Sequence, residues 1–221
     1  TATDKTTGMP TTITYNADIL TTISEGTFYN CYELEELEVL PSIKFIEAYA
    51  FYNCIDELVT EVTVHSNVEQ IGYAAFGGCI NLTEMTLPFV GGHAYTESAD
   101  DTKEELFGYI FGEKHPKDNE THPVLYTADK YDEYVPTKQL DWTFYIPAGL
   151  VKVKLTNTKV IGEYAFVNCN TLTDIILPDN LIHIKNNAFE GCNKLTSIII
   201  PANVETIGRE AFVNSTSLKT V

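Results

Sequence analysis

A short phrase, IGEYAFVNC at residues 161–169, recurs with small changes along most of the chain. Related phrases begin near residues 23, 46, 71, 184 and 207, and the cysteines lie at 31, 54, 79, 169 and 192. Most neighbouring copies are therefore 23 or 25 residues apart. Repetition at about 20–50 residues is the signature of a repeat array. A unit this short cannot bury its apolar face alone, so neighbouring units must stack on one another.

Each repeat also predicts its own local structure. In LTDIIL (172–177), Ile175 and Leu177 are two residues apart and point to the same face of a short strand. The proline that follows has no N–H group to donate and ends the strand. In IGEYAF, the Ile, Ala and Phe are spaced by about one helical turn, which predicts a short helical turn packed against the sheet.

In template form, the repeat reads I-G-x-x-A-F-x-x-C-x-x-L-T-x-I-x-L-P. This pattern resembles the BspA-like leucine-rich repeats of bacterial cell-surface proteins. The resemblance implies an α/β solenoid, a right-handed superhelix with a parallel β-sheet on one face and short helical turns on the other. It also implies a secreted or cell-surface protein that binds proteins or mediates adhesion, with no catalytic residue to carry over. Ser215, which replaces the cysteine in the last copy, does not alter this expectation.

The region 91–160 interrupts the repeat. Residues 103–112 (KEELFGYIFG) have apolar side chains at helical spacing and a terminal glycine, which predicts a short amphipathic helix. Residues 124–145 predict two extended segments in a hairpin-like excursion from the edge of the solenoid. We expect the helix to replace the usual turn in one modified rung, so that residues 1–221 form a single leucine-rich repeat solenoid.

The net charge of −17 and the pI of about 4.5 limit the classes of partner. Such a surface repels nucleic acid and anionic membranes, and no apolar run is long enough for membrane insertion. The first residues are polar and rich in threonine, so we expect a signal peptide and any anchor to lie outside this sequence. We expect a monomer.

The cysteine column is the most conspicuous chemical signal, and it has three interpretations. Disulfides between adjacent rungs would span about 5 Å, but side chains in one column run parallel, and the number of cysteines is odd. Zinc sites use closely spaced pairs such as CxxC, which the chain lacks. We therefore expect buried thiols that act as small apolar residues.

A metal site is conceivable at His115, Asp118 and His122, but Pro116 and Pro123 prevent the helix that would place both histidines on one face. A solvated loop is the favoured interpretation. No G-x-S-x-G, H-E-x-x-H or phosphate-binding loop occurs in the chain. We expect no enzyme activity, no cofactor and no metal.

The outward positions of the strands form the candidate binding surface. Alternation along each strand predicts two outward columns, acidic toward the N-terminus, apolar toward the C-terminus, and with a lysine pair at the modified rung. Aromatic side chains of the excursion are a second candidate. The candidate residues are Glu36, Glu38, Glu61, Glu84, Lys152, Lys154, Asp174, Ile176, Ile199, Tyr131, Tyr134 and Trp142.

The expected partner is a protein, such as a host extracellular matrix or surface protein, or a glycan, because solenoids bind through extended faces. One alternative is a structural spacer that presents other domains of a longer surface protein. A more distant alternative is a carbohydrate-active or metal-dependent site in the insertion.

Overall fold

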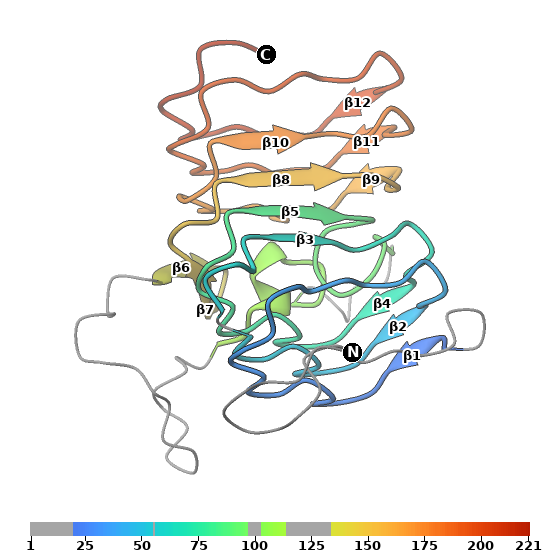
Figure 1. The fold of residues 1–221 in the computed structure, drawn as a ribbon. Coiled ribbons are helices and arrows are strands. Elements are labelled where there is room, and N and C mark those ends of the chain that lie inside the picture. The colour runs from blue at the N-terminus through green and yellow to red at the C-terminus, as the bar shows by residue number, and fades with distance from the viewer. Residues whose placement is uncertain (1–19, 55, 97–102, 114–133) are drawn as a thin grey trace.

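The chain winds into a stack of coils whose strands run parallel from one coil to the next, as the computed structural model in Figure 1 shows. The structure describes residues 20–54, 56–96, 103–113 and 134–221. From β1 (Thr22–Ile23) near the bottom of Figure 1, the coils rise to β12 (Thr206–Ile207) near the top. This architecture is a solenoid, as the repeat predicts, but it is built almost wholly of strands and turns.

The largest sheet has four parallel strands in the order β10-β8-β5-β3. Their bounds are Glu61–Thr63 for β3, Glu84–Leu87 for β5, Lys152–Leu155 for β8 and Asp174–Ile176 for β10. Each strand buries alternate residues, and the central buried positions Val62, Met85, Val153 and Ile175 are paired across the sheet. The predicted parallel sheet is therefore confirmed, with the predicted residues facing inward.

A second set of strands lies on another side of the coil, and the sequence analysis missed it. Two three-stranded parallel sheets have the orders β1-β2-β4 and β12-β11-β9. Their remaining members are β2 (Phe45–Ile46), β4 (Gln70–Ile71), β9 (Val160–Ile161) and β11 (His183–Ile184). The isoleucine that begins each phrase thus belongs to a short strand, and not to a helical turn.

The predicted helical turns are wrong, because the phrase folds into consecutive tight turns. Within one repeat, Val167 N donates to Tyr164 O at 2.9 Å, whereas Phe166 N donates to Ala188 O of the next repeat at 2.8 Å. Along the phrase, backbone amides that donate within the repeat alternate with amides that donate to the next repeat. Tyr164 and Asn168 have φ values of 57°, a left-handed conformation that no right-handed helix contains. The described chain is accordingly almost free of helix, which corrects the α/β assignment.

Phenylalanine rings fill the space between the turns and the sheets. Phe166 and Phe189 are fully buried and stack with centroids 5.4 Å apart and an interplanar angle of 6°. The same stacking joins Phe28 to Phe51, Phe51 to Phe76, and Phe189 to Phe212. The rings thus form two stacked runs, Phe28–Phe51–Phe76 and Phe166–Phe189–Phe212, and Phe107 of the modified rung contacts Phe166 at 5.2 Å.

The modified rung contains the described chain's single 3₁₀ helix, η1 (Phe107–Ile110), in place of the predicted ten-residue helix. Leu106 before it is extended, and Gly112 after it has a φ of 85°, so a longer helix cannot form. The segment still replaces a turn, because Ile110 O accepts from Phe76 N at 2.9 Å, and Phe107 N donates to Ala165 O at 2.9 Å.

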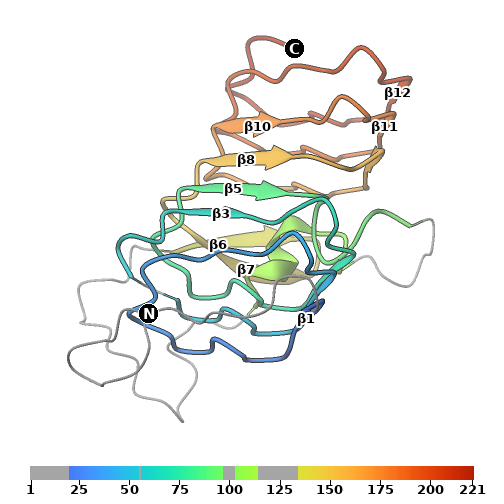
Figure 2. The same ribbon diagram turned by 45° about the vertical axis from the view of Figure 1, so that its right-hand side comes forward.

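An antiparallel hairpin follows, formed by β6 (Tyr134–Gln139) and β7 (Trp142–Pro147). It lies next to η1, as Figure 2 shows. The predicted excursion over 124–145 is thus a hairpin where it is described, and residues 124–133 lie outside the described residues.

One hairpin side chain replaces a hydrogen bond that the regular repeats form between the backbones of successive turns. Gln139 is fully buried, and its Nε2 donates to Val167 O at 3.1 Å while its Oε1 accepts from Gly108 N at 2.7 Å. In the next repeat the equivalent carbonyl, Glu190 O, accepts a backbone amide, that of Asn168, at 2.7 Å. The Gln139 amide group therefore takes the place of a backbone amide that the modified rung does not supply.

Candidate functional site

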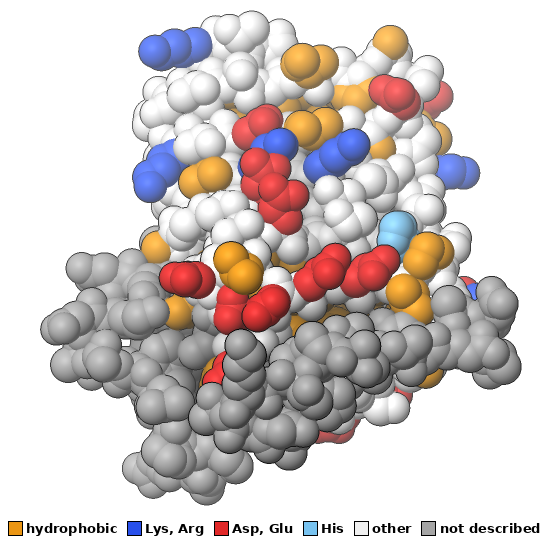
Figure 3. All heavy atoms as spheres, in the orientation of Figure 1, with side chains coloured by type: hydrophobic (Ala, Val, Ile, Leu, Met, Phe, Trp, Pro, Cys, Tyr) orange, Lys and Arg blue, Asp and Glu red, His pale blue; other side chains and the backbone are white. Residues whose placement is uncertain are grey.

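The outward side of the four-stranded sheet carries most of the predicted site residues. We call this surface, formed by the outward side chains of β3, β5, β8 and β10 and of the rungs at 36–38 and 197–199, the front face. Its strands are short and nearly in register, so their outward side chains form columns about 4.8 Å apart from rung to rung. Figure 3 shows acidic side chains over its lower rungs, lysines near β8 and apolar side chains above them.

The first column combines like and opposite charges. Strand pairing places Glu61 beside Glu84, Glu84 beside Lys152, and Lys152 beside Asp174. Lys152 Nζ donates to Glu84 Oε2 at 2.7 Å, and this hydrogen bond raises the pKa of the lysine above its usual value. Glu84 is therefore neutralised within the face. Glu36 lies exposed on the rung before Glu61.

The second column changes from acidic to apolar along the axis. Glu38 bridges to Thr63, and the register continues through Thr86 and Lys154 to Ile176. Ile199 lies on the following rung and is 84% exposed, while Ile176 is 38% exposed. Lys154 is exposed and has no salt-bridge partner among the described residues. The second column is thus acidic at one end and apolar at the other, whereas the first column runs from Glu61 through Lys152 to Asp174 and has no apolar end.

A hollow of about 450 Å³ lies at the acidic end of the front face. We call it the acidic hollow, and its lining residues are Glu35, Glu36, Leu37, Glu38, Leu58, Val59, Thr60, Glu61, Thr63 and His65. None of its four carboxylates forms a salt bridge within the described part of the chain. Leu58 is 62% exposed, so the hollow also offers apolar surface.

Among the aromatic candidates of the excursion, the structure describes the side chain of Trp142, which lies away from the front face. Tyr131 lies outside the described residues, and the side chain of Tyr134 does too. Trp142 is half-buried, with Lys103 Nζ 5.7 Å from the centre of its ring. That ammonium group also lies 5.1 Å from the ring centre of Tyr73 and pairs with Glu113, so Trp142 belongs to a contact between the hairpin and the turns.

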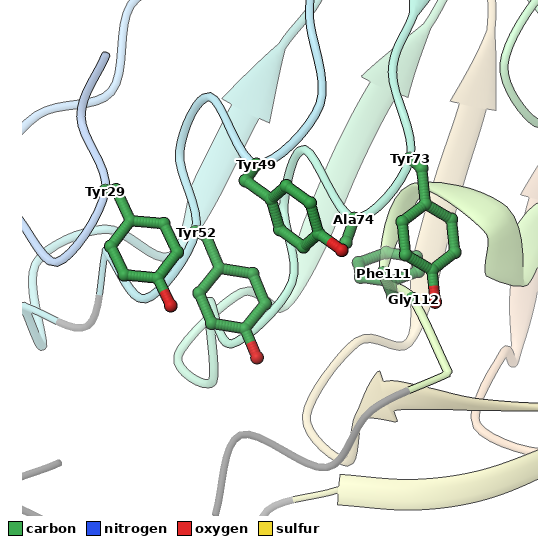
Figure 4. Close-up of a pocket in the computed structure, with 7 residues that line it drawn as sticks. All are labelled: Tyr29, Tyr49, Tyr52, Tyr73, Ala74, Phe111 and Gly112. Atoms are coloured by element: carbon green, nitrogen blue, oxygen red, sulfur yellow. The ribbon is translucent and has the colours of Figure 1, made fainter. Parts of the chain in front are cut away.

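A tyrosine cluster on the turns escaped the sequence analysis. Tyr29 and Tyr52 stack with centroids 5.1 Å apart, and Tyr49 meets both Tyr52 and Tyr73 edge to face. With Phe111 and its neighbours they line a pocket of about 200 Å³, shown in Figure 4. The signal was available, because FYNC occurs in both of the first two repeats and puts a tyrosine at the same position.

The cysteines have a hydrogen-bonding role. Four of the five are buried, and the Sγ of Cys79 and that of Cys192 each lie 3.1 Å from the carbonyl oxygen of the phenylalanine one repeat earlier. Burial raises the pKa of Cys192 to about 12, so its thiol stays protonated and can donate. These thiols point into the core and away from the front face.

Within the described residues, no three side chains of the metal-binding types lie together. His115, Asp118 and His122, which offer a metal set in the sequence, lie outside the described residues. No helix in the described part of the chain is long and apolar enough to span a bilayer.

The family model described as BspA type leucine rich repeat region matches this chain in six copies. The matches cover residues 10–97 and 141–221, which is more than two thirds of the chain. No curated protein matches the chain.

A solved structure of a leucine-rich repeat protein shares the fold. A leucine-rich repeat protein from Eubacterium ventriosum is 18% identical, with a TM-score of 0.54, and the match covers 92% of this chain and 42% of that one. A second, from Bacteroides ovatus, is 22% identical with a TM-score of 0.34, and the match covers 92% of this chain and 64% of that one. The chain thus spans less than two thirds of the length of either protein.

Proposed function

Because the chain belongs to the BspA-type leucine-rich repeat family, we propose that it is a non-enzymatic binding module whose front face docks a protein partner. Repeat solenoids bind through extended surfaces of this kind, since stacking aligns equivalent side chains into long columns. We further propose that residues 1–221 form a single right-handed solenoid and that the protein acts at a bacterial cell surface or after secretion, in adhesion.

The exposed end of the second column carries this proposal. Ile199 is 84% exposed on a face whose neighbouring rungs carry Lys154 and Ile176 outward. A strand needs no isoleucine at a solvated position, and apolar side chains beside unpaired charges are typical of interface surfaces. In a structural spacer, threonine would suit these positions as well as isoleucine does, and threonine occupies the same column at Thr63 and Thr86.

The test uses purified protein and a panel of purified extracellular and cell-surface proteins of an animal host. Surface plasmon resonance is measured for the wild type, for Lys154→Glu and for Ile199→Asp. We expect at least one protein of the panel to bind and both variants to weaken that binding about tenfold or more, as is usual for central interface residues.

Matched controls are Lys159→Glu, at an exposed residue next to β9, and Ile207→Asp, at a residue of β12 that is 49% exposed. They should leave binding unchanged. Equal loss in all four variants, or none in any of them, would rule out the front face as the docking surface. A chain that binds no protein of the panel would favour the spacer.

A further inference from the structure

We propose that the front face takes one extended polypeptide segment, laid along the solenoid axis, with basic residues in the acidic hollow and apolar residues against Ile176 and Ile199. This inference rests on the proposed function and names the chemistry of the partner. It depends on the arrangement of the whole face, since the carboxylates of the acidic hollow and the exposed isoleucines lie at opposite ends of the second column.

The carboxylates of the front face divide into a neutralised and an unneutralised group. Glu84 is bound by Lys152 at 2.7 Å. Glu61, its direct neighbour in the sheet, has no salt-bridge partner among the described residues, and Glu36 and Glu38 have none either. Stacked like charges on adjacent strands destabilise a sheet. A partner's ammonium or guanidinium groups would remove that repulsion, so charge complementarity selects a basic occupant.

The shape of the acidic hollow fits lysine and arginine side chains. These side chains have apolar stems that lie along apolar surface while the charged group stays solvated. Leu58, which is 62% exposed, and the buried Val59 line the hollow together with the carboxylates. The hollow therefore offers a contact for the stem as well as for the charge.

The opposite end of the face requires a different chemistry. Five rung spacings of about 4.8 Å separate Glu38 from Ile199, which is about 24 Å. An extended chain advances about 3.4 Å per residue, so about seven residues cover this length. Lys154 lies between the two ends and lacks an ion-pair partner in the described chain. The fitting segment thus has basic residues at one end, a carboxylate near its middle and apolar residues at the other.

A polypeptide fits this order of chemistry, and other polymers do not. Nucleic acid carries phosphates that the carboxylates repel. A neutral glycan offers no cation for the acidic hollow. A polypeptide can place cationic, anionic and aliphatic groups in sequence within about 24 Å.

The probe is a fluorescein-labelled nine-residue peptide with three basic residues at one end, a central aspartate and two leucines at the other end. It is made in both chain directions, and a scrambled peptide has the same composition. Fluorescence anisotropy with the full 221-residue chain is expected to show at least fivefold tighter binding of one ordered peptide than of the scrambled one. Affinity should fall as salt is raised from about 50 to about 200 mM, because partly exposed charges are screened.

The variant is the triple change Glu36→Gln, Glu38→Gln and Glu61→Gln, which keeps side-chain size and removes three charges. We expect it to weaken binding of the ordered peptide about tenfold. The matched control carries Glu25→Gln, Glu163→Gln and Glu205→Gln, three exposed carboxylates beside the second set of strands. It changes net charge equally and should bind as the wild type does.

Equal binding of ordered and scrambled peptides overturns the inference, because the attraction would then be only that of a polyanion for a polycation. Equal loss in the triple variant and its control overturns it too. The two proposals can be told apart: if Ile199→Asp abolishes capture of a protein partner while the triple glutamine variant retains it, the proposed function stands and the inference of a basic segment fails.

Discussion

At the scale of single residues, the end of each phrase needs a small side chain that can donate a hydrogen bond. Cys192 Sγ bonds the carbonyl of Phe166 at 3.1 Å, and Ser215 Oγ bonds that of Phe189 at 2.7 Å. Ser215 therefore keeps the contact that the cysteines make. The cysteine column is explained by this bond as well as by small size, which the sequence analysis took as its sole reason.

A pH-dependent comparison of Cys192→Ser with the wild type tests this role. The thiol ionises near 9.0 when unconstrained, but burial raises the pKa of Cys192 to about 12. Between these values the unfolded chain releases the proton and the folded chain retains it. Wild-type stability should therefore fall with rising pH over this range, by up to about 1.4 kcal/mol per pH unit for this thiol.

Cys192→Ser should match the wild type near pH 7 and lose less stability at about pH 10, in urea unfolding at both values. Cys192→Ala supplies the contrast, because it removes one of the two donors to the carbonyl of Phe166 and keeps only Cys169 N at 3.1 Å, and it should cost about 0.5–1.5 kcal/mol at neutral pH. Parallel alkaline losses in the wild type and the serine variant would contradict the assignment.

At the scale of elements, the hairpin and η1 together replace one turn of the regular coil. The turns of a regular repeat form backbone hydrogen bonds with the turns of their neighbours, and at the modified rung only some of these bonds remain, such as Phe76 N to Ile110 O and Phe107 N to Ala165 O. Gln139 replaces one of the missing bonds, and Asn168 Nδ2 donates to Lys138 O at 2.8 Å from the other side. The hairpin is therefore tied into the stack by hydrogen bonds as well as by apolar packing.

Gln139→Leu should destabilise the protein by about 2–4 kcal/mol, because it leaves a buried carbonyl at Val167 and a buried amide at Gly108 without partners. Urea unfolding measures the loss, and hydrogen exchange should show the amides of β6 and β7 exposed first. Lys138→Ala, at the exposed neighbouring position, should change stability by less than about 0.5 kcal/mol. Equal effects of the two substitutions would show that the hydrogen bonds of Gln139 do not hold the hairpin against the stack.

At the scale of the whole molecule, stability comes from contacts between successive coils, because each contacts only its neighbours. The stacked phenylalanines are an example of such contacts. Phe189 is fully buried between Phe166 and Phe212, with ring centroids 5.4 and 5.1 Å away. Phe212 is half-buried and has a described ring partner on one side.

Phe189→Ala should therefore cost about 3–5 kcal/mol, as expected when a buried aromatic ring leaves a cavity. Phe212→Ala should cost clearly less, since that ring is packed on one side and half exposed. Urea unfolding with hydrogen exchange distinguishes the two, because the second substitution should expose only amides of the last rung. Global loss of protection in both variants would mean that the coils do not fold as nearest neighbours.

The sequence by itself determined the stacking, the strands of the front face and the order of its outward columns. These follow from local patterns, since a two-residue alternation ending at proline specifies which strand positions face outward. The tertiary structure decided the rest. Apolar spacing in IGEYAF fits a tight turn as well as a helix, and hydrogen bonds to the next coil select the left-handed conformation of Tyr164. The second set of strands and the hydrogen bonds of Gln139 depend on such contacts between distant residues, which no local pattern encodes.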